Sequence, residues 1–94
     1  MSKFELGQIV MTKGVHEKIL SDHAFCNFIS ESLSKYMNAD WGDTCEEDAE
    51  QNDISVNEGD RILAVYTNPK TNETIWIITE WDRSVTTILF PSEY

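Results

Sequence analysis

Residues 61–90, RILAVYTNPKTNETIWIITEWDRSVTTILF, contain three β-prone runs separated by two turn-forming segments. Each run is rich in β-branched and aromatic residues, and the runs span 61–67, 74–81 and 85–90. The loop NPKTN at 68–72 has the length of a hairpin connection, DRS at 82–84 turns the chain again, and Pro91 ends the third run. This stretch therefore predicts a three-stranded antiparallel meander at the centre of the fold.

A meander of this size needs a helix on one face to bury its apolar side. Residues 22–37 supply that helix, because their apolar side chains recur at helical spacing and form one stripe: Phe25, Phe28, Ile29, Leu33, Tyr36 and Met37. Ser21 or Asp22 is the predicted N-cap, and Asn38 is the predicted stop.

Two smaller elements precede this helix. QIVMT at 8–12 predicts a short strand, and residues 15–20 predict a helical stretch that breaks at Ser21–Asp22. No linker or repeat divides the chain. The predicted fold class is therefore α+β: an N-terminal short strand and two to three helices packed on a C-terminal three-stranded antiparallel meander, in one domain over residues 1–94.

The charge of the chain is concentrated in one segment, residues 40–60. Seventeen acids and seven bases give a net charge of −10, and nine of the acids lie in this segment without a base: Asp40, Asp43, Glu46, Glu47, Asp48, Glu50, Asp53, Glu58 and Asp60. The other 73 residues hold eight acids and seven bases, a net of −1. Such a field repels nucleic acid and attracts basic surfaces across about one Debye length.

The acidic segment also carries signals for local structure. Thr44 and Glu47 match a capping box, which predicts a short helix over 45–54, and the segments 40–43 and 57–60 read as turns. Trp41, within DWGD, is either an interface anchor or a core residue; Gly42 favours the core, because it indicates a tight, buried turn.

Membrane spans and secretory signals are not predicted. No apolar run approaches about 18 residues, and the first ten residues carry Glu5 and no long apolar region. Cys26 and Cys45 lie far apart without a disulfide framework. A cytoplasmic protein with reduced thiols is the expectation.

Metal and cofactor sites are not predicted either. Asp40, Asp43, Glu46 and Glu47 offer oxygen ligands, but their spacing is not that of an EF-hand. The cysteines and histidines do not have zinc-site spacing, and no dinucleotide or phosphate-loop motif occurs.

Catalysis would need a Cys–His pair, and the candidate is Cys26, three residues after His23. A small thiol packed in a helix beside Phe25 is the more ordinary role for Cys26, so we expect no enzyme. Glu80 shares a predicted strand face with Trp76 and Ile78, so it needs a partner if that face is buried, and Arg61 or Arg83 is the expected one.

Three segments resemble a known family: IWIITEWDRSVTTILFPSEY at 75–94, DWGD at 40–43 and GDRILAVYTNPKT at 59–71. The family consists of small proteins carried on plasmids and conjugative elements of gut bacteria, often labelled "plasmid-related protein". The resemblance spans about residues 7–94. It implies a mobile-element setting and a link to anti-CRISPR activity, but the family has no assigned site whose residue roles could be transferred.

Carboxylates spaced along a helix and its turns can replace phosphates in a basic cleft, because duplex DNA carries about one charge per 1.7 Å of axis. We therefore predict an acidic inhibitor, of anti-CRISPR or antirestriction type, that binds the basic nucleic-acid surface of a defence nuclease complex by DNA mimicry. It would itself bind neither nucleic acid nor membrane. The predicted partner-binding residues are Asp40, Trp41, Asp43, Glu46, Glu47, Asp48, Glu50 and Asp53.

The alternatives stay open. The acidic segment can be a solvated face that keeps the protein in solution. The chain would then be a non-enzymatic interaction or regulatory module of a plasmid or conjugative element, which binds through its sheet face or forms a homodimer through exposed Trp76 or Trp81.

Overall fold

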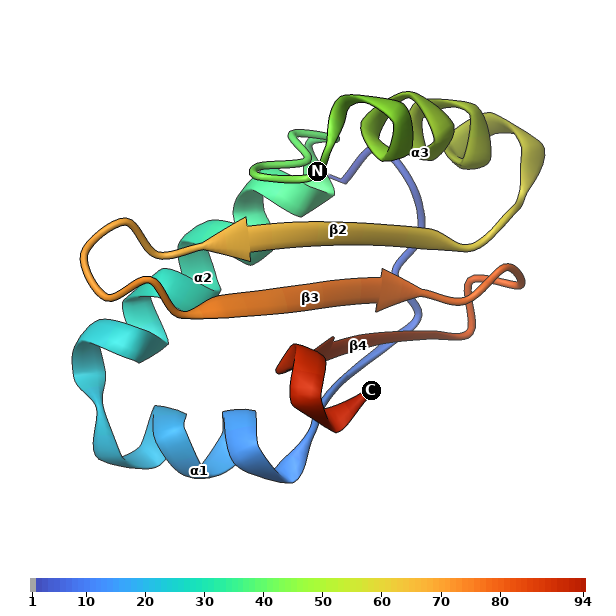
Figure 1. The fold of residues 1–94 in the computed structure, drawn as a ribbon. Helices are drawn as coiled ribbons and strands as arrows, with labels where there is room; N and C mark the ends of the chain where they lie inside the picture. The colour runs from blue at the N-terminus through green and yellow to red at the C-terminus, as the bar shows by residue number, and fades with distance from the viewer. Residues whose placement is uncertain (1) are drawn as a thin grey trace.

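The predicted meander is present, and a fourth strand extends it. The computed structural model describes residues 2–94 and has a four-stranded mixed sheet with the strand order β1-β4-β3-β2, flanked by three α-helices (Figure 1). In chain order the elements are β1 (Gln8–Met11), α1 (Lys13–Ser21), α2 (His23–Met37), α3 (Glu46–Glu58), β2 (Ile62–Thr67), β3 (Thr74–Thr79), β4 (Val85–Leu89) and the 3-10 helix η1 (Pro91–Glu93). The α+β class predicted from the sequence is therefore confirmed.

Strands β2, β3 and β4 pair antiparallel in sequence order, and β1 pairs parallel to β4. The register places Gln8 opposite Val85 and Met11 opposite Ile88. Gly7 allows this approach, because its φ is +63° and a Cβ at this position would overlap the Ser84 carbonyl group. The N-terminal strand thus becomes one edge of the sheet, while β2 is the other edge.

One face of the sheet packs on the helical layer. Ile62, Ala64 and Tyr66 of β2 are buried on this face. Helix α2 lies behind the sheet in Figure 1 and buries Phe25, Ile29 and Tyr36 of its apolar stripe. Asp22 caps α2 by accepting a hydrogen bond from the N–H of Phe25 at 3.1 Å, and the helix ends before Asn38. The predicted cap and stop of this helix are confirmed.

A chain of buried hydroxyl groups crosses the core. The Thr86 hydroxyl donates to the carbonyl of Leu6 at 2.6 Å and contacts the Thr79 hydroxyl at 2.8 Å, which in turn contacts the Tyr36 hydroxyl at 2.6 Å. Because each hydroxyl has a single proton, Thr79 must donate to Thr86 and Tyr36 must donate to Thr79. Burial raises the pKa of Tyr36, which keeps the donating proton on the phenol.

The opposite face of the sheet is partly covered by the C-terminus, which lies in front of β4 in Figure 1. The ring of Tyr94 packs edge-on against Trp76, with 5.5 Å between the ring centroids. The Glu93 carboxylate reaches the first turn of α1, where it accepts hydrogen bonds from the Thr12 hydroxyl at 2.6 Å and from the N–H of Gly14 at 2.9 Å. Glu93 therefore caps α1 from the far end of the chain, and these bonds lower the pKa of its carboxyl group.

Helix α3 departs from the prediction at both ends. Its N-cap is Cys45, and the predicted capping box between Thr44 and Glu47 does not form, because the Thr44 hydroxyl bonds the backbone of Trp41 and Val65 instead. The helix continues four residues beyond the predicted end at Ile54, through Glu58. Gly59, with φ of +79°, then ends it in the left-handed conformation.

Candidate functional site

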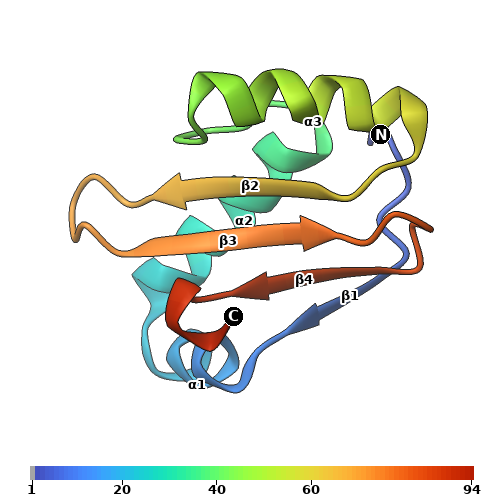
Figure 2. The same ribbon diagram turned by 45° about the vertical axis from the view of Figure 1, so that its right-hand side comes forward.

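The acidic helix α3 lies along the outer edge of β2 (Figures 1 and 2). Only two of its residues, Asn52 and Ser55, are fully buried, and Ala49 and Val56 are partly buried against the core. The rest of the helix faces solvent. This arrangement places the acidic segment at one margin of the molecule.

Side chains of the acidic segment hydrogen bond the backbone of β2, which would otherwise be an open strand edge. Asn52 bonds both the C=O and the N–H of Leu63, at 2.9 and 3.3 Å. The Thr44 hydroxyl accepts from the N–H of Val65 at 2.8 Å, and Asp43 both donates its own N–H to the carbonyl of Val65 and accepts from the N–H of Thr67. These hydrogen bonds from residues 43–52 take the place of those that a neighbouring strand would make, and they hold α3 at the sheet edge.

Trp41 is a core residue, as the sequence favours. Its side chain is 6% exposed and packs against Tyr36 and Phe4, with ring centroids 5.6 and 6.0 Å away. The indole N–H donates to the Asp53 carboxylate at 2.8 Å, which ties the turn to α3. Asp40 supports the same turn, because its side chain accepts from the N–H of Gly42 and its carbonyl accepts from the Tyr66 hydroxyl.

The eight predicted partner-binding residues thus divide into two groups. Asp40, Trp41, Asp43 and Asp53 make the internal contacts described above. Glu46, Glu47, Asp48 and Glu50 are exposed on α3. None of the ion pairs formed within residues 2–94 includes an acid of the 40–60 segment.

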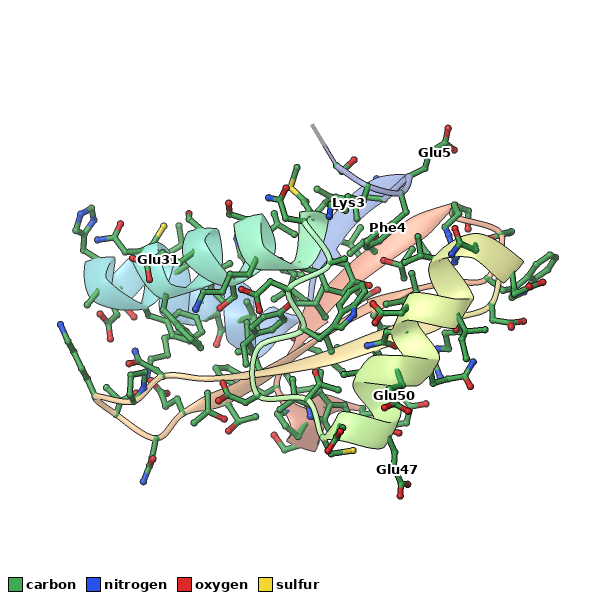
Figure 3. All side chains as sticks on the ribbon, turned by 90° about the horizontal axis from the view of Figure 1, so that it is seen from above. Lys3, Phe4, Glu5, Glu31, Glu47 and Glu50 are labelled. Carbon is green, nitrogen blue, oxygen red and sulfur yellow. The ribbon has the colours of Figure 1, made fainter. Side chains whose placement is uncertain are left out.

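The exposed acids form a surface that we call the α3 acidic face: Glu46, Glu47, Asp48, Glu50 and Glu58, with Asp53 at its border. Helical periodicity places Glu46, Glu47 and Glu50 on the side away from the buried residues of α3. Figure 3 shows Glu47 and Glu50 pointing away from the body of the protein. Ile54 is 53% exposed within this face. The sequence signal that predicted the site was the run of acids, and it could not separate the acids that make internal hydrogen bonds from those that do not.

A hollow of about 370 Å³ lies between α2 and the β2–β3 hairpin. Phe28, Ser32 and Tyr66 line it, and its charged residues are Glu31, Lys35, Asp43 and Lys70. The two acids and two lysines balance, so the hollow does not extend the α3 acidic face. No pattern in the sequence indicates this hollow, because its walls come from segments that are distant in the chain.

The residues considered as metal ligands or as a Cys–His pair do not form a cluster within the described chain. Within residues 2–94, no three His, Cys, Asp or Glu side chains lie together in a way that could hold a metal ion. His23 is exposed at the start of α2, and Cys26 is partly buried one turn later. Neither residue makes a side-chain hydrogen bond within the described chain that would indicate an activated nucleophile.

The expected partner of Glu80 is confirmed, since Arg61 Nε lies 3.6 Å from its carboxylate. A hydrogen bond to the Tyr94 hydroxyl raises the pKa of Arg61. Arg83 has a different role: its guanidinium donates to the carbonyls of Ser55 and Asp60 at 2.7 Å, and so it satisfies the C-terminal end of α3. Trp81, at the β3–β4 turn, is 68% exposed.

Comparisons with known proteins add no relative: no protein-family model, curated protein or solved structure matches the chain. Among residues 2–94, no helix combines the length and the apolar character needed to cross a membrane.

Proposed function

We propose that the protein is a non-enzymatic inhibitor that docks the α3 acidic face on the basic nucleic-acid surface of a defence nuclease complex, of CRISPR or restriction type. The observation that carries the proposal is the outward display of α3: six acids in thirteen residues are exposed, and no base lies between residues 40 and 60.

The spacing of these carboxylates resembles that of phosphates. At about 1.5 Å per residue, the thirteen residues of α3 span about 20 Å. Six carboxylates over that length give about one charge per 3 Å, against about one phosphate per 3.4 Å along a single DNA strand. A basic cleft that binds one strand would therefore meet a similar line charge on α3.

Two further features fit a docking role. The helix is held at the sheet edge by Asn52 and by the hydrogen bond of Trp41 to Asp53, so its backbone has little conformational entropy to lose when its face binds. Ile54 supplies an apolar contact within the charged face, where a central buried side chain contributes most to affinity.

The test is competition with target DNA. The protein is titrated into purified CRISPR effectors and restriction complexes, and DNA binding is measured at about 50 and about 200 mM salt. A pair of variants with equal charge separates docking from net charge: Glu47→Gln with Glu50→Gln on α3, and Glu5→Gln with Glu31→Gln elsewhere on the surface (Figure 3).

We expect the wild-type protein and the Glu5/Glu31 variant to displace DNA, and their own binding to the nuclease, measured without DNA, to weaken from about 50 to about 200 mM salt because the attraction between charges is screened. The Glu47/Glu50 variant should need at least ten-fold more protein for the same effect. If the two variants inhibit equally, or if charge reversal at Glu46, Glu47 and Glu50 together leaves inhibition intact, DNA mimicry by α3 is wrong.

A second candidate is a protein-interaction module that binds through the sheet face or the β3–β4 turn. The exposed indole of Trp81 favours it, whereas Trp76 is half-buried against Tyr94. In this case binding should tolerate salt, should be lost in Trp81→Ala, and should survive the change of Glu47 and Glu50 to glutamine.

A further inference from the structure

The two edges of the sheet differ in whether their outward backbone groups are hydrogen bonded. The β2 edge is closed by Asp43, Thr44 and Asn52, whereas β1, the outermost strand on the other side, is not covered along its length (Figure 2). The N–H of Gln8 donates to the carbonyl of Ser84, the residue before β4, at 3.0 Å, and the N–H of Thr12 donates to the carbonyl of Ile88 in β4 at 3.1 Å. Because backbone groups alternate in direction along a strand, the N–H and C=O groups of Ile9 and Met11 must point away from β4.

These outward groups have no backbone partner within residues 2–94. The side chains beside them are apolar, and those of Ile9 and Met11 are each 42% exposed. An edge strand with free backbone groups and exposed apolar side chains is a template for another strand. The register of β1 with Thr86 and Ile88 places both side chains on the face of the sheet that carries the helices.

The charge distribution is compatible with a second copy of the chain as the partner, and the apolar pair Ile9 and Met11 is self-complementary about a two-fold axis. Residues 2–20 hold three lysines and two glutamates, a net of +1, in a protein of net charge −10. The excess acid lies at the opposite edge of the sheet, on α3. Two copies can therefore meet at their β1 edges without bringing their acidic segments together.

We propose that the protein dimerises by antiparallel pairing of β1 with β1 of a second copy, about a two-fold axis at Val10. Ile9 then faces Met11 of the other copy and exchanges two backbone hydrogen bonds with it, and the symmetric pair does the same. The apolar side chains of Ile9 and Met11 from both copies form one row, and the two sheets become a continuous sheet of eight strands with an α3 acidic face at each end.

The contact is short, four residues per copy, and belongs to the weak end of specific interfaces, below about 1,200 Å² in total. The dimer should therefore depend on concentration. Sedimentation equilibrium between about 10 µM and 1 mM should show the average mass rising from 10.8 kDa towards about twice that value.

A matched pair of variants tests the surface. Ile9→Lys and Ile54→Lys make the same change at side chains that are 42% and 53% exposed, on opposite edges of the sheet. Ile9→Lys should weaken association at least ten-fold, while Ile54→Lys should not. Ile9→Pro should act like Ile9→Lys with the fold retained, because the lost N–H is the one that faces solvent.

Cross-linking tests the register. On the two-fold axis, the Cα atoms of the two Val10 residues form a non-hydrogen-bonded pair about 4.5 Å apart, within disulfide range. In a background of Cys26→Ser and Cys45→Ser, Val10→Cys should form a disulfide-linked dimer under mild oxidation, and Gln8→Cys should not. A wild-type protein that remains monomeric at 1 mM, or equal association of the two lysine variants, would overturn the proposal. The β1 edge would then be open to a strand of another protein.

Discussion

The side-chain amide of Asn52 makes the two hydrogen bonds to β2 that the backbone of a neighbouring strand would otherwise make. The residue is 4% exposed, and its amide satisfies both the donor and the acceptor of Leu63. Buried polar groups that lose their partner cost far more than the bond itself contributes. Asn52 is therefore a position where a small substitution should have a large effect on stability.

Replacing Asn52 by alanine should lower the free energy of unfolding by about 1–3 kcal/mol, because the N–H and C=O of Leu63 would lose their partners in a partly buried place. Asn57→Ala is the matched control, since Asn57 is exposed on the same helix and gains the same helix propensity. Urea unfolding curves of the two variants measure the difference. Equal stabilities would show that Asn52 does not close the edge of β2.

Glu93 should give the protein an acid-dependent contribution to stability. Hydrogen bonds from Thr12 and Gly14 lower its pKa in the folded state. A lowered folded pKa means that the contribution is complete above the unfolded pKa, about 4.3, and disappears as the pH falls through the folded pKa. Glu93→Gln should thus lower the melting temperature at pH 7 and have little effect near pH 2.

The measurement is a series of thermal melts from pH 7 down to pH 2 on the wild type and on two variants, Glu93→Gln and Glu31→Gln. Glu31 is exposed on α2 and makes no ion pair within residues 2–94, so its variant should follow the wild type. A constant difference between wild type and Glu93→Gln at every pH would contradict a role for the ionised carboxylate.

At the scale of elements, the local sequence patterns predicted the helices and strands, whose formation depends on neighbouring residues. The β-prone run 61–67 predicted β2, and the apolar stripe predicted α2 with Ser21 or Asp22 as its cap, of which Asp22 is the one that forms. The parallel pairing of β1 with β4 could not be predicted, because it joins residues more than seventy positions apart. The same holds for Glu93 as the cap of α1.

The capping box predicted for α3 was wrong for the same reason, a contact between residues that are distant in the sequence. Thr44 and Glu47 have the spacing of a capping box, but the Thr44 hydroxyl is taken by the backbone of Val65, twenty-one positions away. For the candidate site, the sequence located the acidic segment. It could not show that Asp43 and Asp53 hydrogen bond internally while Glu47 and Glu50 point outwards. That division depends on which side of α3 meets β2.

Helix α3 should gain stability from a charge change at its C-terminus. Its last turn holds Glu58 and no base, and an acid there opposes the helix dipole. Glu58→Lys should therefore raise the free energy of unfolding by about 0.3–1 kcal/mol at low salt. Glu5→Lys makes the same change of net charge outside any helix. If both variants gain equally in thermal melts, the gain comes from net charge and not from the dipole.

The whole molecule is electrically one-sided. Its excess acid lies with α3 on the β2 edge, and the β1 edge is nearly neutral. Crowding nine carboxylates into residues 40–60 costs stability through mutual repulsion, because the folded state holds them closer together than the unfolded chain does. The arrangement therefore does not serve stability, which fits both the docking role that we propose and a solvated face that keeps the protein in solution.

The repulsion predicts how stability depends on salt. The Debye length falls from about 30 Å at 0.01 M to about 3 Å at 1 M, so added NaCl should screen the acidic segment and raise the free energy of unfolding. Salt also strengthens the burial of apolar groups, which raises the free energy of unfolding by a separate route. This second effect is the same in two variants of equal charge, so it cancels when they are compared. The rise measured by urea unfolding from 0.01 to 0.5 M NaCl should be smaller in the Glu47→Gln/Glu50→Gln variant than in the Glu5→Gln/Glu31→Gln variant. If the free energy of unfolding rises equally with NaCl in both variants, the repulsion is spread over the whole surface. The acids of α3 would then not be the main source of charge repulsion in the folded protein.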